Sequence, residues 1–258
     1  MAPLEGLGIL VTRPVGQSVN LAHQIREAGG EAILFPTLEI AGVDDHTMLH
    51  AIIDRLERYD WAIFISPNAV EKGMALIRSR RPLPQALRIA AIGQGGADAL
   101  ARLGIENVLT APEGNDSEAL LALPELREVA GFRVVIFRGV GGRETLKAEL
   151  TRRGADVIYA QCYRRRKPEC DPAPVQALGK DGKINAITVT SAESLRNLCD
   201  LLGENTGGWE KRTPLFAPHP RIVAAARESG WEKVFATGPG DDGLVKGLTQ
   251  WRNQEKHG

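Results

Sequence analysis

Polar residues and glycines follow the short apolar segments of this sequence, at the points where a strand would end and a helix would begin. Turns of this kind leave backbone N–H groups free at a helix N-terminus, a position that favours an anion. Arginines stand among them and would add charge for binding a carboxylate or phosphate. The predicted chemistry is therefore binding of a small anionic ligand. The candidate residues are Thr12, Arg13, Ser66, Asn68, Gly93, Gln94, Arg138, Gly139, Arg143, Ser191, Ala192, His219 and Arg221.

A simpler role exists for each of these residues taken singly. Ser, Asn, Asp and Gly are also the usual helix caps and turn formers, and at any single turn capping is the more common role. Several such turns interspersed with Arg13, Arg138, Arg143 and Arg221 favour a shared anion-binding cleft instead.

Other kinds of site have weak support in the sequence. The glycines at 138–144 (RGVGGRE) match neither a dinucleotide fingerprint nor a P-loop. His46 and His50 are four positions apart but lack an HExxH motif, and no GxSxG nucleophile turn occurs. The three cysteines form no CxxC pair. We therefore expect neither a metal nor a cofactor.

The segments that must position the candidate residues repeat along the chain. Arg13 and Arg138 are 125 positions apart, and so are Ser66 and Ser191. The same offset holds over 7–35 and 132–160, and an offset of 126 matches 87–105 to 213–231. One register kept over three blocks predicts an internal duplication.

Six continuous apolar runs read as strands buried on both faces, as in parallel sheets. They lie at 8–12, 61–66, 89–93, 134–137, 186–190 and 214–217.

Amphipathic helical segments alternate with these runs. In the first, we expect Val19, Ala22, Ile25 and Arg26 near one stripe, and Gly29 to end the helix. We interpret Met48 and Met74 as core residues. Alternating strands and helices with short connections predict an α/β fold with doubly wound parallel sheets.

Length and composition agree with two lobes. The chain has 258 residues, 43% hydrophobic and 25% charged, with a formal net charge of zero. A neutral chain points to neither a nucleic-acid nor a membrane partner. No signal-like segment and no apolar run of about 18 residues occurs, so we expect a cytoplasmic protein.

The chain resembles the uroporphyrinogen-III synthase family over about 5–247. No single motif is very specific, but their order and spacing are. The matching segments are VTRP (11–14), FISPNAV (64–70), AIGxGxAxAL (91–100), RGxGGRExL (138–146), RGAxVxxxxxYRR (153–165), VTSxExLxNL (189–198) and PHPRI (218–222).

The resemblance implies a domain plan. Two flavodoxin-like α/β lobes are joined by a two-strand linker, and the first lobe is discontinuous. We expect that lobe at 1–36 plus 168–258, the inserted lobe at 42–160, and linker strands at 37–41 and 161–167. The proline-bounded extended segments at 35–42 and 160–170 fit such a linker.

The resemblance also implies the reaction. A cofactor-independent hydro-lyase, acting as a cytoplasmic monomer in haem, sirohaem and cobalamin biosynthesis, would cyclise hydroxymethylbilane to uroporphyrinogen III. The hydroxyl leaves as water, and ring D is attacked at its substituted carbon and recloses inverted through a spiro intermediate. The substrate carries an acetate and a propionate on every pyrrole, and hydroxymethylbilane synthase would hand it over.

The family's implicated tyrosine aligns with Tyr163, which would help the hydroxyl to leave. Packing at the hinge is the alternative role for Tyr163. The substrate cyclises unaided to the wrong isomer, so we expect graded effects of substitution, with no indispensable residue. The family often has threonine where Gly96 precedes Ala97, and a glycine–threonine turn where His219 stands. Arg221 would then take over a carboxylate contact.

Three other functions remain open. A two-lobed binding protein or ligand sensor would share this fold, and a second kind of enzyme would act on another polyanion such as a phosphorylated metabolite. A family member without activity would serve as an interaction module, although Tyr163 is present.

Overall fold

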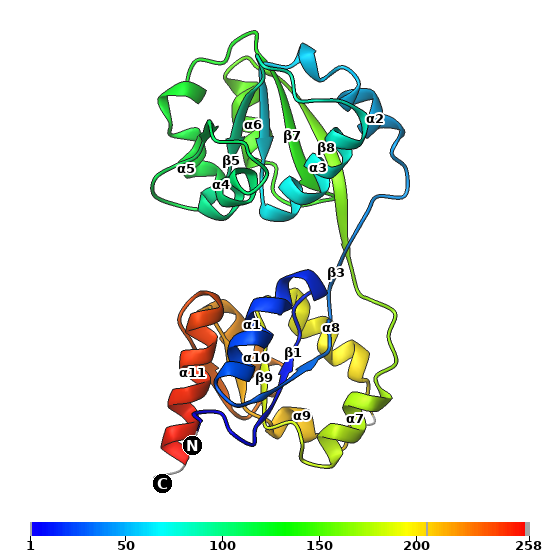
Figure 1. Cartoon of the computed structure of the whole chain (residues 1–258), viewed down its shortest axis with the longest axis vertical. Coiled ribbons are helices and arrows are strands. Elements are labelled where there is room, and N and C mark those ends of the chain that lie inside the picture. Colours follow the sequence, from blue (N-terminus) through cyan, green and yellow to red (C-terminus); the bar gives the residue numbers. More distant parts are fainter. Residues whose placement is uncertain (1, 205, 256–258) are drawn as a thin grey trace. The chain divides into compact units, whose positions relative to one another are not determined.

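The chain builds two parallel β-sheets, each within a unit that has its own hydrophobic core (Figure 1). The computed structural model describes residues 2–204 and 206–255. The terminal lobe comprises Met1–Glu39 and Arg166–Gly258, and the central lobe comprises Ile40–Arg165. The predicted α/β fold class with parallel sheets is confirmed.

The sheet of the terminal lobe has five strands, and every neighbouring pair is parallel. Their side chains are buried most completely in the three inner strands, as expected of a sheet covered on both faces. The order is β11 (Val234–Ala236), β10 (Leu215–Ala217), β9 (Ala186–Thr188), β1 (Gly8–Val11) and β2 (Glu31–Leu34).

The sheet of the central lobe has six strands. Its order is β3 (Glu39–Ala41), β8 (Asp156–Arg166), β7 (Arg133–Gly139), β4 (Trp61–Phe64), β5 (Arg88–Ala91) and β6 (Val108–Leu109). From β8 to β6 all neighbours pair in parallel.

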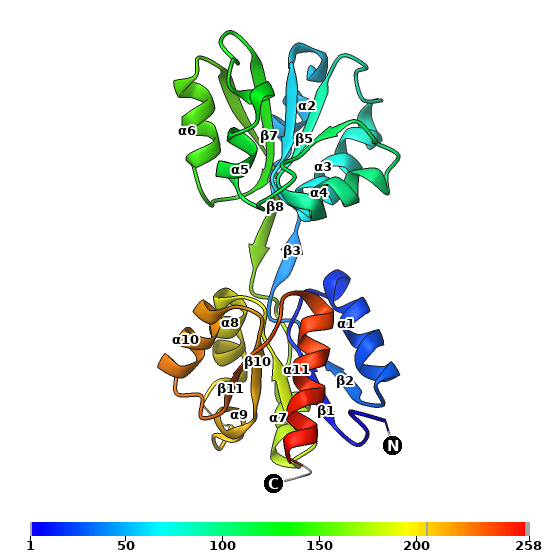
Figure 2. The same cartoon turned by 90° about the vertical axis from the view of Figure 1, so that its left-hand side faces the viewer.

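Helices cover both faces of the terminal sheet. Two pack side by side on one face, and Leu21, Leu244 and Trp251 are buried there against β1 and β10 (Figure 2). These are α1 (Val15–Glu27) and α11 (Gly240–Glu255). The opposite face carries α7 (Ala173–Lys180), α8 (Ala192–Leu202), α9 (Trp209–Arg212) and α10 (Pro220–Glu228).

The central sheet is covered in the same way, which makes it doubly wound. One face carries α2 (Thr47–Ile53), α3 (Pro67–Arg80) and α4 (Gly93–Ala101), with the short helix η1 (Leu56–Arg58). The other carries α5 (Ser117–Leu121) and α6 (Thr145–Arg152), with η2 (Pro124–Leu126).

The two sheets have equivalent strand orders, but each lobe combines strands from both sequence repeats. β1 and β2 of the first repeat complete the terminal sheet beside β9. Their equivalents in the second repeat, β7 and β8, occupy the same places in the central sheet beside β4. The repeats have therefore exchanged their first two strands.

The chain passes between the lobes through β3 and β8, which are neighbours in the central sheet. The division falls between Glu39 and Ile40 and between Arg165 and Arg166. On the central side Arg164 pairs with Asp44.

Two sequence interpretations are wrong in detail. Val19 is 67% exposed, and the buried stripe of α1 is Ser18, Leu21, Ala22 and Ile25, because the face turns by one residue from the predicted one. Met48 is 73% exposed at the start of α2, whereas Met74 is buried as expected.

Within residues 2–204 and 206–255, every helix is too short or too polar to cross a lipid bilayer.

Candidate active site

The carboxyl ends of β4, β5 and β7 lie side by side at one edge of the central sheet. Ligands of open parallel sheets bind beyond this edge, because the strand-to-helix turns are gathered there. Ser66 follows β4 and caps α3, since its Oγ accepts a hydrogen bond of 3.2 Å from the Ala69 N–H. An extended backbone at Ser66 and a proline at the next position explain why the helix begins here.

Tyr163 on β8 meets Ser66 at this edge. Their hydroxyl oxygens are 3.1 Å apart, within hydrogen-bonding distance. The Tyr163 side chain is only 3% exposed. Its ring packs so closely over Gly139 that a Cβ at this position would lie 2.6 Å from the ring. The hydroxyl is thus held beside the N-terminus of α3 by packing as well as by hydrogen bonding.

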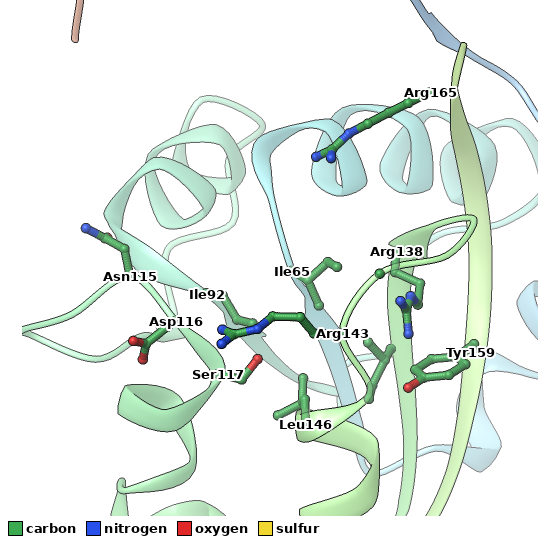
Figure 3. Close-up of a pocket in the computed structure, with 12 residues that line it drawn as sticks. Ile65, Ile92, Asn115, Asp116, Ser117, Arg138, Arg143, Leu146, Tyr159 and Arg165 are labelled. Carbon is green, nitrogen blue, oxygen red and sulfur yellow. The ribbon is translucent and has the colours of Figure 1, made fainter. Parts of the chain in front are cut away.

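A pocket of about 310 Å³ opens at the same edge, between the turn after β7 and the turn before α5 (Figure 3). Its floor is apolar, with Ile65, Ile92 and Leu146. Its polar lining comes from Asn115, Asp116, Ser117, Arg138, Arg143, Tyr159 and Arg165.

Arg138 lies beneath the turn after β7 and is 2% exposed. All three of its guanidinium nitrogens donate to this turn: Nε to the Gly139 carbonyl, Nη2 to the Gly141 carbonyl, and Nη1 to Glu144 Oε1 at 3.0 Å. The guanidinium also lies 4.3 Å from the centre of the Tyr159 ring. A buried arginine requires such partners, because an unpaired buried charge is costly.

Glu144 and Tyr159 complete this group. The Tyr159 hydroxyl donates to Glu144 Oε2 at 2.6 Å. This hydrogen bond and the one from Arg138 lower the pKa of the Glu144 carboxyl. Burial and the bond to Glu144 raise the pKa of Tyr159 to about 12. At neutral pH the group therefore contains a carboxylate, a guanidinium and a neutral phenol.

Arg143 differs from Arg138 although both line the pocket. Its side chain is 71% exposed, and its Nη1 lies 3.7 Å from Glu118 Oε2. Figure 3 shows Arg143 extending across the pocket toward Ser117, while Arg138 and Tyr159 lie together on the other side. Arg143 is thus the better placed of the two arginines to bind an incoming carboxylate.

The remaining central-lobe candidates lie in the neighbouring turns. Asn68 stands in the first turn of α3 and is half-buried. Gly93 begins α4 with a φ of +70°, and a Cβ there would lie 2.4 Å from Asn115 Oδ1. Gln94 is exposed, and its amide donates to Asp98.

The terminal lobe holds the other candidates at the carboxyl edge of its own sheet. Thr12 is buried, and its hydroxyl donates to the Thr188 carbonyl at 2.8 Å. Arg13 forms an ion pair with Asp241 in the first turn of α11. Both side chains therefore already have partners within the lobe.

Two further turns of this lobe carry caps. Ser191 caps α8 by accepting from the Ser194 N–H at 3.0 Å, and Ala192 is the first residue of that helix. His219 caps α10, with Nδ1 accepting from the Arg221 N–H at 3.1 Å. The Arg221 side chain is exposed.

The structure thus gathers the candidates into two sets, one at the carboxyl edge of each sheet. The predicted cleft between the lobes stays a prediction, as do the site roles. The two residues that hydrogen-bond to each other beside Arg138, Glu144 and Tyr159, were given no role by the sequence analysis. Glu144 lies inside the quoted 138–146 motif and Tyr159 inside the 153–165 motif, but only the fold brings them together.

Comparisons with known proteins agree along nearly the whole chain. Residues 19–246 match the family model described as uroporphyrinogen-III synthase HemD. The chain is 34% identical to the uroporphyrinogen-III synthase of Salmonella typhimurium over 245 residues, which cover 94% of this chain and 100% of that protein. It is 33% identical to the enzyme of that name from Synechococcus elongatus, with 98% of each chain covered.

The fold agrees with a solved structure. A crystal structure of a mutant uroporphyrinogen III synthase from the extremely thermophilic bacterium Thermus thermophilus superposes with a TM-score of 0.61 at 16% identity. The match covers 96% of this chain and 99% of that one. The chain therefore belongs to the uroporphyrinogen-III synthase family, whose reaction is the cyclisation of hydroxymethylbilane.

Proposed function

We propose that this chain binds the carboxylates of hydroxymethylbilane through the turns at the carboxyl edges of its sheets, and that Tyr163 assists departure of the substrate hydroxyl. The carrying observation is the 3.1 Å contact between the Tyr163 and Ser66 hydroxyls at the N-terminus of α3. A hydroxyl held at this point can donate a proton or a hydrogen bond to a leaving group.

Either hydroxyl can donate in this contact, and the proposed mechanism uses the arrangement in which Ser66 donates to Tyr163. Ser66 Oγ already accepts from the Ala69 N–H, so its own proton is available for the Tyr163 oxygen. In that arrangement the phenolic proton of Tyr163 is free to point toward the substrate. Transfer of this proton to the substrate hydroxyl lets the C–O bond break with loss of water, which leaves a phenolate on Tyr163 and, on the substrate, the cation that ring D attacks.

In the central lobe, Arg143 is the residue to which we assign carboxylate binding. It is exposed at the pocket, whereas the nitrogens of Arg138 are used within the turn. A guanidinium matches a carboxylate with two parallel hydrogen bonds, so Arg143 suits an acetate or propionate. Most of the catalytic effect would come from holding the flexible substrate in one geometry.

The experiment is a coupled assay in which hydroxymethylbilane is generated in place and the oxidised uroporphyrin isomers are separated. Predominance of isomer III is expected for the wild type. Tyr163→Phe should lower kcat about ten- to a hundredfold with little change in KM, because it removes the donor and keeps the ring. Only isomer I at the unassisted rate from the wild type would contradict the proposal.

A control separates chemistry from packing. Tyr59→Phe changes a half-buried tyrosine of the same lobe that has no place in the proposed mechanism, and it should leave kcat unchanged. If Tyr163→Phe also leaves kcat unchanged, Tyr163 serves only to pack against Gly139.

Delivery of the substrate is a second part of the proposal. We propose that hydroxymethylbilane synthase hands the substrate over in the cytoplasm, since a substrate that closes unaided to isomer I gains from a short free lifetime. Direct handover predicts that the fraction of isomer III stays constant when both enzymes are diluted together. A fraction that falls with dilution would indicate free diffusion.

A further inference from the structure

The turn after β7 carries the arginine proposed to bind a carboxylate, and its backbone needs support. Gly141 and Gly142 have φ angles of +77° and +103°, which are favourable for glycine and give the turn little intrinsic rigidity. Val140 is 55% exposed and contributes little packing. The conformation of this turn therefore depends on contacts with the buried side chains that lie between it and the sheet.

Arg138 supplies those contacts. It donates to the carbonyls of Gly139 and Gly141 at the beginning of the turn and to Glu144 at its end. A Cβ on Gly142 would lie 2.9 Å from Arg138 Nη2, so the turn also folds closely over the guanidinium. One buried side chain thus binds both ends of the turn.

Tyr159 on β8 holds Arg138 and Glu144 in place. Its hydroxyl donates to Glu144 Oε2 at 2.6 Å, while the guanidinium of Arg138 lies over its ring. Lys147 Nζ lies 4.6 Å from the same ring, near the beginning of α6. The strand β8 is paired with β7 from Asp156 to Gln161, on both sides of Tyr159, and therefore provides a rigid base for this group.

We infer that Arg138, Glu144 and Tyr159 form a positioning network that holds Arg143 at the pocket for a substrate carboxylate. The inference rests on the proposed function, in that Arg143 is the ligand of that carboxylate. Arg138, Glu144 and Tyr159 act through the turn and are positioning residues. Pre-organisation of this kind lowers the ordering cost of binding, so its loss should appear in KM.

The test uses Tyr159→Phe, which removes the bond to Glu144 but keeps the ring beneath Arg138. Glu144→Gln is the second variant, because it keeps an acceptor and loses the charge. The matched control is Tyr59→Phe. Circular dichroism should show that all three variants are folded. Amide hydrogen exchange of residues 139–144 should accelerate in the first two variants and not in the control.

The kinetic result expected is a KM for hydroxymethylbilane about three- to tenfold higher in Tyr159→Phe, with kcat within about twofold of wild type. In a protein that already carries Arg143→Ala, adding Tyr159→Phe should not raise KM further, because no guanidinium remains to be positioned. A general loss of stability would not produce this dependence on Arg143.

The outcomes separate the two proposals. If Arg143→Ala raises KM but Tyr159→Phe does not, or if the two effects multiply in the double variant, the positioning network is wrong and the carboxylate contact stands. If Arg143→Ala leaves KM unchanged, the carboxylate contact itself is wrong. Unchanged hydrogen exchange in both Tyr159→Phe and Glu144→Gln would also overturn the network.

Discussion

Two arginines at equivalent positions of the repeats, Arg13 and Arg138, show that the residue type alone does not reveal whether a charge is available to a ligand. Arg13 and Arg138 were both predicted as anion ligands because each follows the first strand of its repeat. In the structure each is bound by a carboxylate of its own lobe, Asp241 and Glu144 respectively. A guanidinium withdrawn from water needs such a partner, so buried arginines are more often structural than exposed ones.

Gly139 is the residue on which the placement of Tyr163 depends most directly. Gly139→Ala would put a Cβ 2.6 Å from the ring, so the ring must move. We expect a loss of stability of about 1–3 kcal/mol and a lower kcat, because overpacking displaces the hydroxyl. Urea unfolding and the coupled assay measure the two effects.

The control for this prediction is Gly42→Ala. A Cβ at Gly42 has open space around it. This variant should keep wild-type stability and kcat. A Gly139→Ala protein that behaves like the Gly42→Ala protein would show that the ring accommodates the methyl group without cost.

Helix α6 is the element that carries the carboxyl end of the turn above the pocket. Glu149 on this helix accepts hydrogen bonds from Arg152 and Arg153, and Arg153 also donates to the carbonyls of Leu121 and Leu126. The hydrogen bonds of Arg153 thus tie the end of α6 to α5 and to η2, while the ion pair with Glu149 holds the guanidinium in place. The arginines lower the pKa of Glu149 to about 2 from 4.5.

The stabilisation from Glu149 should depend on pH in a defined direction. Because the pKa is lower in the folded state, the contribution is full above about pH 4.5 and is lost as the pH falls toward about 2. Glu149→Gln should therefore lower Tm at pH 7. The difference in Tm between this variant and the wild type should become smaller below about pH 4.5. Thermal scans by circular dichroism at several pH values measure this. A difference that is constant with pH would contradict the assigned role of the charge.

At the scale of the whole molecule, the two lobes have separate hydrophobic cores. Leu150 on α6 is buried against β7 in the central lobe, and Leu198 on α8 is buried against β9 in the terminal lobe. Two cores connected by two chain segments need not unfold together.

We expect two overlapping unfolding transitions in calorimetry, one for each lobe. Leu150→Ala should lower the midpoint temperature of the central-lobe transition, and Leu198→Ala that of the terminal-lobe transition. Each substitution should reduce the free energy of unfolding of its own lobe by about 2–5 kcal/mol. Each variant serves as the control for the other. If both substitutions shift a single transition equally, the lobes unfold as one cooperative unit.

Much of the architecture was predictable from the sequence for local reasons. Continuous apolar runs such as 134–137 predict buried parallel strands, and all six predicted runs overlap strands of the structure. The constant offset between Arg13 and Arg138 predicted the duplication. The exchange of strands between the repeats was harder to predict from the sequence. The apolar periodicity is the same whether each repeat forms its own lobe or the repeats exchange their first two strands, so the family resemblance was needed to favour the exchange.

The sequence by itself determined which residue types stand at the strand ends, from which an anionic ligand was predicted, and the order and spacing of its motifs indicated the family. It did not determine how those residues are used. Arg138 and Arg143 are five positions apart and chemically identical, yet one is buried against Tyr159 and the other is exposed at the pocket. That difference arises from the pairing of β7 with β8, which brings together residues distant in sequence. Only the tertiary structure decides which charges remain available to a ligand, because burial and hydrogen-bond partners are properties of the packed fold.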